Sequence, residues 1–313
     1  MSENRNKYRM FCKKDDAIPL FSQAWWLDAV AGENNWDVAL VEKGGNIFAS
    51  MPYCIEKKYG QTIIKHPKLT QTLGIYFNYP KNQKYYKKLS FEKEMMTKLI
   101  EQLPKFDKFT KSFNYNSTNL LPFYWKGFSL NVNYTYIIEN VSIEELEKGF
   151  ETDIRRRRRK AEENHIKVYE STDIEKFYEL NKMTFIRQNA TIPYSMEFVK
   201  NLYFATQKHN ASKIFFAEHE NRIIAASFLV FDKNHLYYII GGIDPDKRDL
   251  GGMDIVHYKS IQFALESNRI YDFEGSMIES IEKYVRKFGA IQKPYFQVSK
   301  VNSRVLKMKE LLI

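Results

Sequence analysis

The segment HLYYIIGGIDPDKRDLGGMDIVHYKSIQFALESNRIYDF, residues 235–273, decides how the second half of this chain folds. It predicts an apolar strand over 235–243, a polar turn, an amphipathic helix that opens at Gly251-Gly252, and a second short strand at 270–273. Glycine lets the backbone approach a ligand closely, and the first N–H groups of a helix are unsatisfied donors at the positive end of its dipole. The segment therefore predicts a phosphate or pyrophosphate site at the start of the helix.

The length of the chain indicates two domains. With 313 residues it is long for a single core and sufficient for two domains of about 150 residues each. The order of the predicted elements places the boundary so that residues 1–145 and 146–313 form the two domains.

The composition favours a protein of the reducing cytoplasm. The longest clean apolar run, 223–231, is far shorter than the roughly 20 residues that a membrane span needs, and the polar N-terminus has no signal-peptide core. The cysteines Cys12 and Cys54 are far apart and predict no disulfide framework. The six histidines never recur at helical spacing and have no cysteine neighbours, so we expect no metal site.

The net charge of +10 comes mostly from one place. Six positive charges lie in the run RRRRRK, residues 155–160, which leaves an excess of only +4 for the rest of the chain. Such a local concentration does not imply a general nucleic-acid surface, and we expect no DNA partner.

The predicted elements indicate a mixed α/β fold. Two strands at 36–42 and 47–55 are separated by Gly44-Gly45-Asn46 and predict a hairpin. In the second half a basic helix covers about 152–164, and the meander 213–231 comes before the strand–helix–strand segment. An antiparallel meander followed by strand–helix–strand units predicts a mixed sheet, the α+β variety of the α/β class.

Several short motifs, in a fixed order, carry a resemblance to a known family. They are Arg248-x-x-Gly251-Gly252, the run YDFEGS at 271–276, Phe288-Gly289-Ala290 with Pro294-Tyr295 after it, and the basic helix before Ile166. This arrangement resembles the GNAT acyltransferase superfamily, and within it the double-GNAT proteins related to the Fem peptidoglycan-bridge transferases. The resemblance implies two tandem GNAT-like domains, of which the first is degenerate and the second holds an acyl-CoA pyrophosphate loop.

Two positions depart from the family pattern. Met253 stands where the pyrophosphate loop usually has glycine or alanine. Tyr284 and Val285 stand where tRNA-dependent Fem enzymes typically have a Phe-Lys pair. Loss of that lysine favours acetyl-CoA or another acyl-CoA over aminoacyl-tRNA as the donor.

The resemblance also assigns residues to roles. Glu274 is the preferred base for an amine nucleophile, and Tyr284 a candidate acid for the departing thiolate; a helix cap and a packed aromatic are the alternatives. The residues expected to bind the cofactor lie in the strand–turn–helix segment: Gly242, Ile243, Arg248, Gly251, Gly252, Met253 and Asp254.

The basic helix has two competing interpretations. Arg155 and Arg158 are expected to bind an anionic substrate, because the planar guanidinium binds phosphate through two hydrogen bonds. Asp272, at a strand end beside the expected cofactor, is also expected to contact the substrate. The alternative is a solvated helix face, since Glu162 and Glu163 follow Arg158 and Arg159 at i+4.

These observations favour an acyl-CoA-dependent N-acyltransferase that acts on an amine of a sugar, a nucleotide-sugar or another small or anionic cell-envelope precursor. Two alternatives stay open. One is an aminoacyl-tRNA-dependent transferase for peptidoglycan bridges, with tRNA as a less favoured partner. The other is a GNAT-fold binding module without catalysis.

Overall fold

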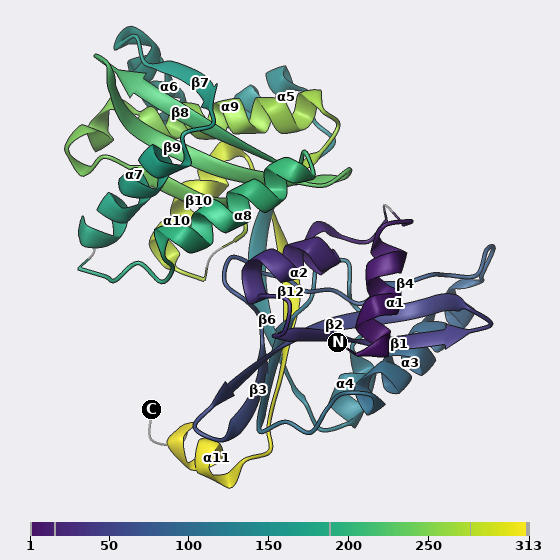
Figure 1. Ribbon diagram of the computed structural model, residues 1–313. Coiled ribbons are helices and arrows are strands. Elements are labelled where there is room, and N and C mark those ends of the chain that lie inside the picture. The colour runs from purple at the N-terminus through teal and green to yellow at the C-terminus, as the bar shows by residue number, and fades with distance from the viewer. Residues whose placement is uncertain (1, 16, 188, 276, 311–313) are drawn as a thin grey trace. The chain divides into compact units, whose positions relative to one another are not determined.

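The computed structural model describes residues 2–15, 17–187, 189–275 and 277–310 (Figure 1). The chain divides into two compact units, Met1–Asn133 together with Pro294–Ile313, and Tyr134–Lys293. The first is called unit 1 here and the second unit 2. The expected boundary lay between residues 145 and 146, whereas the contacts divide the chain at two places and assign the last segment to unit 1.

Unit 1 is built on a mixed sheet with the strand order β1-β2-β3-β5-β12. Its predicted hairpin is present, since β1 and β2 pair antiparallel on either side of Gly44-Gly45. Strand β3 then pairs in parallel with β5. The strands are β1 (Trp36–Lys43), β2 (Asn46–Lys58), β3 (Gln61–Lys65), β4 (Tyr76–Phe77), β5 (Lys108–Ser112) and β12 (Ile291–Val301). The helices are α1 (Glu3–Cys12), α2 (Ala24–Ala31), α3 (Tyr85–Glu101), α4 (Leu121–Trp125) and α11 (Arg304–Glu310).

An aromatic cluster forms much of the core of unit 1. Phe109 of β5 lies against Phe128 with the ring centroids 5.2 Å apart, and Phe123 of α4 meets Phe128 at 5.1 Å. All three side chains are buried beneath α3, whose Leu99 is fully enclosed. Edge-to-face packing of this kind stabilises a core beyond the burial of area alone.

Lys111 of β5 is an ionisable group inside this unit. Its side chain is 2% exposed, and its ammonium donates to the carbonyl of Pro52 at 2.5 Å. Burial lowers the pKa of Lys111 to about 7. Burial likewise lowers the pKa of His66 to about 4, and the Nε2 atom of this ring accepts a hydrogen bond from the N–H of Ser112 at 2.8 Å. The interior of unit 1 therefore favours the neutral forms of Lys111 and His66.

Unit 2 has the strand order β6-β11-β10-β9-β8-β7. The segment β8-β9-β10 is the predicted antiparallel meander, and β11 joins β10 in parallel, so the mixed α/β class is confirmed. The strands are β6 (Ser129–Ile138), β7 (Lys167–Ser171), β8 (Ser212–His219), β9 (Arg222–Phe231), β10 (His235–Ile243) and β11 (Ile270–Asp272). The helices are α5 (Ile143–Gly149), α6 (Thr152–Glu163), α7 (Ile174–Arg187), α8 (Met196–Lys208), α9 (Gly252–Glu266) and α10 (Glu279–Val285).

Helices cover both faces of the unit 2 sheet. Leu229 of β9 belongs to the core cluster that contains Val256 and Ile261 of α9. The preceding residue, Phe228, points to the other face and meets Phe177 of α7 at 5.8 Å between ring centroids. Successive residues of a strand alternate between faces, so β9 is apolar on both sides. No helix in the described parts of the chain is long and apolar enough to cross a membrane.

The pKa of Lys111 makes the stability of unit 1 depend on pH. The folded form releases its proton near pH 7 and the unfolded chain near pH 10.5, so the unfolded state holds more protons in between and stability rises with pH. We expect the free energy of unfolding to rise by roughly 1 to 2 kcal/mol between pH 7 and pH 8.5 relative to Lys111→Met, measured by urea denaturation. The exposed Lys105→Met variant serves as the control and should keep the wild-type slope. An identical slope in Lys111→Met would contradict the prediction.

Candidate functional site

The predicted strand–turn–helix is present in unit 2. Strand β10 ends at Ile243, the 3-10 helix η2 (Pro245–Leu250) follows, and α9 begins at Gly252. Gly251 joins the two with a φ of +81°, in the left-handed region that favours glycine. No side chain in the described part of the chain caps the first turn of α9. The backbone N–H groups at this end of the helix are therefore in the arrangement that anions bind.

The glycine pair also has a packing role within the fold. A Cβ atom on Gly251 would lie 2.5 Å from the carbonyl oxygen of Arg157 in α6. A Cβ atom on Gly252 would lie 2.8 Å from the Cδ1 atom of Ile224 in β9. Both distances are shorter than real Cβ contacts. The backbone oxygen of Arg157 requires glycine at position 251 whether or not a ligand is bound, whereas the flexible end of Ile224 can shift to admit a side chain at position 252.

Helix α7 closes over the end of β10. The side-chain amide of Asn181 donates to the carbonyl of Gly241 at 2.6 Å. The N–H of Ile243 donates to the hydroxyl of Thr184 at 3.2 Å. A Cβ atom on Gly242 would lie 2.7 Å from the backbone nitrogen of Asn181. The predicted contacts of Gly242 and Ile243 with a cofactor therefore compete here with hydrogen bonds and packing from α7.

Arg248 lies exposed in η2, and it has no ion-pair partner among the described residues. Another arginine stabilises this turn, because Arg222 pairs with the buried Asp244 at 2.5 Å. Asp244 also accepts the N–H of Asp246 at 3.0 Å. The guanidinium of Arg248 is consequently not required by the turn and is free to meet an anion beside α9.

Met253 is directed into the core. Its sulfur lies 4.0 Å from the hydroxyl of Tyr238, and the side chain packs against the core cluster of unit 2. The large residue at this position of the loop is thus accommodated inside the domain.

Three side chains meet beneath the first turn of α9. Asp254 is 3% exposed, and its Oδ2 atom lies 4.0 Å from the guanidinium of Arg157. The carboxyl group of Asp254 and the hydroxyl of Tyr284 interact with each other, but neither the Oδ1 atom of Asp254 nor this hydroxyl makes a hydrogen bond of regular geometry within the described residues. Burial raises the pKa of Asp254, and burial together with the charge of Asp254 raises the pKa of Tyr284. Two neighbouring buried polar atoms without a regular hydrogen bond are unusual in a protein core.

Asp272 supports the turn that follows β11. Its buried carboxylate accepts the hydroxyl of Thr135 at 2.6 Å and the N–H of Glu274 at 2.8 Å. Glu274 itself has a φ of +61°, and burial, with the charge of Asp272, raises its pKa well above the usual range. A residue other than glycine pays about 1 kcal/mol or more for this backbone conformation. The hydrogen bond from the N–H of Glu274 to Asp272 therefore holds Glu274 in a strained backbone conformation. The carboxylate of Asp272, which was predicted to bind substrate, is engaged by Thr135 and Glu274 within the fold.

The two arginines predicted to bind substrate lie in different surroundings. Arg158 pairs with Glu147 at 2.6 Å and stacks over the ring of Tyr258 at 4.3 Å. Arg155 is exposed, and among the described residues its guanidinium bonds to the hydroxyl of Thr152, at 3.4 Å. The acids expected at i+4 lie 3.6 and 3.7 Å from Arg158 and Arg159. Much of the basic helix is therefore neutralised by its own acidic neighbours.

Sequence patterns missed three of the residues that shape this site. Arg157 stood in a run of five arginines, and only the close approach of α6 to Gly251 distinguishes it from its neighbours. Asn181 and Thr184 lie about 60 positions before the strand whose backbone they bind. No group of three or more potential metal ligands occurs among the described residues.

Comparisons with known proteins agree with this geometry. Residues 148–278 match the family model described as Acetyltransferase (GNAT) domain. No curated protein sequence matches the chain. The crystal structure of FemX is similar over 95% of this chain and 96% of its own, with 15% identity and a TM-score of 0.70.

Two further solved structures share the fold. L-PGS from Bacillus licheniformis is 10% identical, with 98% and 95% of the two chains covered and a TM-score of 0.60. A conserved protein of unknown function from Bacteroides thetaiotaomicron is 11% identical, with 95% and 97% covered and a TM-score of 0.59. The predicted resemblance is thus confirmed: residues 148–278 match the GNAT domain, and the chain shares the fold of FemX.

Proposed function

We propose that this protein is an N-acyltransferase that moves an acyl group from a CoA thioester to an amine. The observation that carries the proposal is the uncapped N-terminus of α9 beside the exposed Arg248, within the part of the chain that matches the GNAT domain. Backbone N–H groups, the helix dipole and one unpaired guanidinium are the combination that binds a pyrophosphate.

The charges around the loop suit a diphosphate. Arg157 faces Asp254 from α6 and offsets its negative charge. The positive potential at the start of α9 is therefore not cancelled by the carboxyl group beneath it.

The transfer needs two proton movements. The amine attacks the thioester carbonyl, the C–N bond forms, and the C–S bond breaks without a covalent enzyme intermediate. Glu274 takes the proton that the attacking nitrogen loses, and Tyr284 gives a proton to the departing thiolate. An ordinary tyrosine hydroxyl is already protonated at neutral pH, and the raised pKa of Tyr284 leaves it so, as a proton donor requires. An amine on a sugar or on a cell-envelope precursor is the acceptor.

An aminoacyl-tRNA donor is the second candidate, and the likeness in fold to FemX favours it. Against it stands the basic helix, where Arg156 to Arg159 each pair with a nearby acid. The buried Val285 also occupies the place where tRNA-dependent relatives have a lysine. A binding module without catalysis would hold CoA without turnover on any amine.

Arg248→Ala should weaken CoA binding about five-fold, because one charge-assisted contact with the pyrophosphate is lost at an exposed site. Isothermal titration with CoA at fixed ionic strength measures the effect. Lys233→Ala removes the same charge from the exposed turn between β9 and β10 and should leave the affinity unchanged. Unchanged affinity in Arg248→Ala would reject the role of Arg248. If acetyl-, succinyl- and longer acyl-CoAs all fail to bind the wild-type protein, the donor proposal is wrong.

Glu274→Gln should reduce kcat/KM for acyl transfer by a factor of about 100 or more. A base must be ionised, so the wild-type rate should rise with pH through the raised pKa of Glu274, well above the ordinary carboxyl range. That rise should disappear in Glu274→Gln and persist in Glu279→Gln, which alters an exposed acid paired with Lys283. A pH profile that is the same in Glu274→Gln and the wild type would exclude Glu274 as the base.

If tRNA were the donor, the protein would bind it at low salt, and the affinity would fall steeply as salt increases. We expect instead little binding in a filter assay at 50 mM salt, and no difference between the wild type and Arg155→Glu. Tight, salt-sensitive binding that Arg155→Glu weakens would replace acyl-CoA with aminoacyl-tRNA in the proposal.

A further inference from the structure

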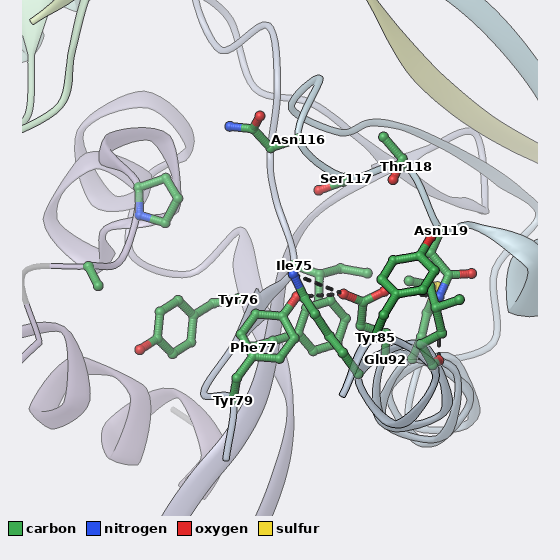
Figure 2. Close-up of a pocket in the computed structure, with 15 residues that line it drawn as sticks. Ile75, Tyr76, Phe77, Tyr79, Tyr85, Glu92, Asn116, Ser117, Thr118 and Asn119 are labelled. Carbon is green, nitrogen blue, oxygen red and sulfur yellow. Dashed lines mark hydrogen bonds and ion pairs between the residues drawn. The ribbon is translucent and has the colours of Figure 1, made fainter. Parts of the chain in front are cut away.

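Unit 1 contains a pocket of about 300 Å³ that lies entirely within its own residues. Its wall is formed by strand β4 with its flanking residues, the first turns of α3, and the polar segment 116–119 (Figure 2). Every lining residue belongs to unit 1, so the pocket shares no residue with the α9 loop of unit 2.

One side of the pocket is aromatic. Tyr76, Phe77, Tyr79 and Tyr85 all line it. The ring of Tyr79 meets that of Phe77 with the centroids 5.7 Å apart, which fixes one part of the wall. Tyr85 at the start of α3 is 76% exposed, so its ring contributes little to the core. An exposed ring at the edge of a cavity is available to stack on a ligand.

The two charged side chains of the lining face each other. Glu92 accepts the hydroxyl of Tyr79 at 2.7 Å and the amide of Asn119 at 2.9 Å. Lys88 lies 4.0 Å from Glu92, and its ammonium is 4.6 Å from the centre of the Tyr79 ring. The positive and negative charges of the wall therefore largely offset each other, which disfavours both a phosphorylated and a strongly cationic ligand.

The opposite side offers neutral polar groups. Asn116, Ser117 and Thr118 follow one another along it, and Figure 2 shows their side chains above the aromatic wall, whereas the amide of Asn119 reaches Glu92. Amides and hydroxyls both donate and accept hydrogen bonds, so this edge matches a ligand with several hydroxyl groups. A cavity that joins an aromatic wall to a neutral polar edge presents an apolar face and a hydrogen-bonding rim to the same ligand.

We propose that this pocket binds a neutral saccharide unit, a hexose or an N-acetylhexosamine. The C–H face of the sugar ring lies against Tyr85, and its hydroxyls bind Glu92 and the 116–119 segment. We infer that the sugar is one part of the acceptor molecule, and only this inference rests on the function proposed above. Binding of the sugar itself does not depend on catalysis.

The test is saturation-transfer NMR of N-acetylglucosamine and glucose with the full chain in the absence of CoA. We expect saturation of the sugar protons, and at least a five-fold weaker effect in Tyr85→Ala and in Glu92→Gln. Two matched variants serve as controls. Tyr86→Ala removes the neighbouring exposed ring, which does not line the pocket, and Glu94→Gln alters an acid of the same helix that pairs with Lys98.

No saturation of either sugar by the wild-type protein would overturn the proposal, as would equal effects in all four variants. Displacement of the sugar by an equal concentration of uridine monophosphate would also overturn it, because the pocket would then prefer an anion. CoA titration of the same samples separates this failure from failure of the acyltransferase proposal, since CoA binding would persist when only the sugar site is wrong.

Discussion

The approach of the α6 backbone to the start of α9 is the constraint on which the candidate site depends. The carbonyl of Arg157 leaves no room for a side chain at Gly251. This contact places the guanidinium of Arg157 beside Asp254, and the pair offsets a buried negative charge directly beneath the helix terminus. Without the contact, the first turn of α9 would bring an uncompensated carboxylate to the place where an anion is expected.

Only the parts of the site that depend on local sequence patterns could be predicted from the sequence. The strand, turn and helix follow from local patterns, because alternating apolar residues, a glycine pair and a helical period each act over a few residues. The roles of Asn181 and Thr184 depend on where α7 packs, which local patterns do not encode. Asp272 was assigned to substrate for its position at a strand end, yet Thr135, more than 130 residues earlier, engages it.

Charge patterning was informative only in part. The i+4 spacing correctly indicated that acids relieve the repulsion among the arginines of α6. It gave no indication that Arg158 would stack on Tyr258 or that Glu147 of α5 would join it. The order of motifs across the second half was a stronger guide than any single residue, because packing of neighbouring elements must satisfy all of them together.

The path of the chain has a consequence for folding during synthesis. Unit 2 is complete once Lys293 has been made, whereas the sheet of unit 1 still lacks β12 at that moment. Strand β12 covers one edge of β5, and Phe113 donates its N–H to Phe296 in the same segment. The N-terminal residues of unit 1 therefore emerge first but close their sheet last, so β5 keeps an unpaired edge until after unit 2 has formed. Such an edge is prone to pair with another chain, and the synthesis of unit 2 before β12 lengthens the time for which it is open.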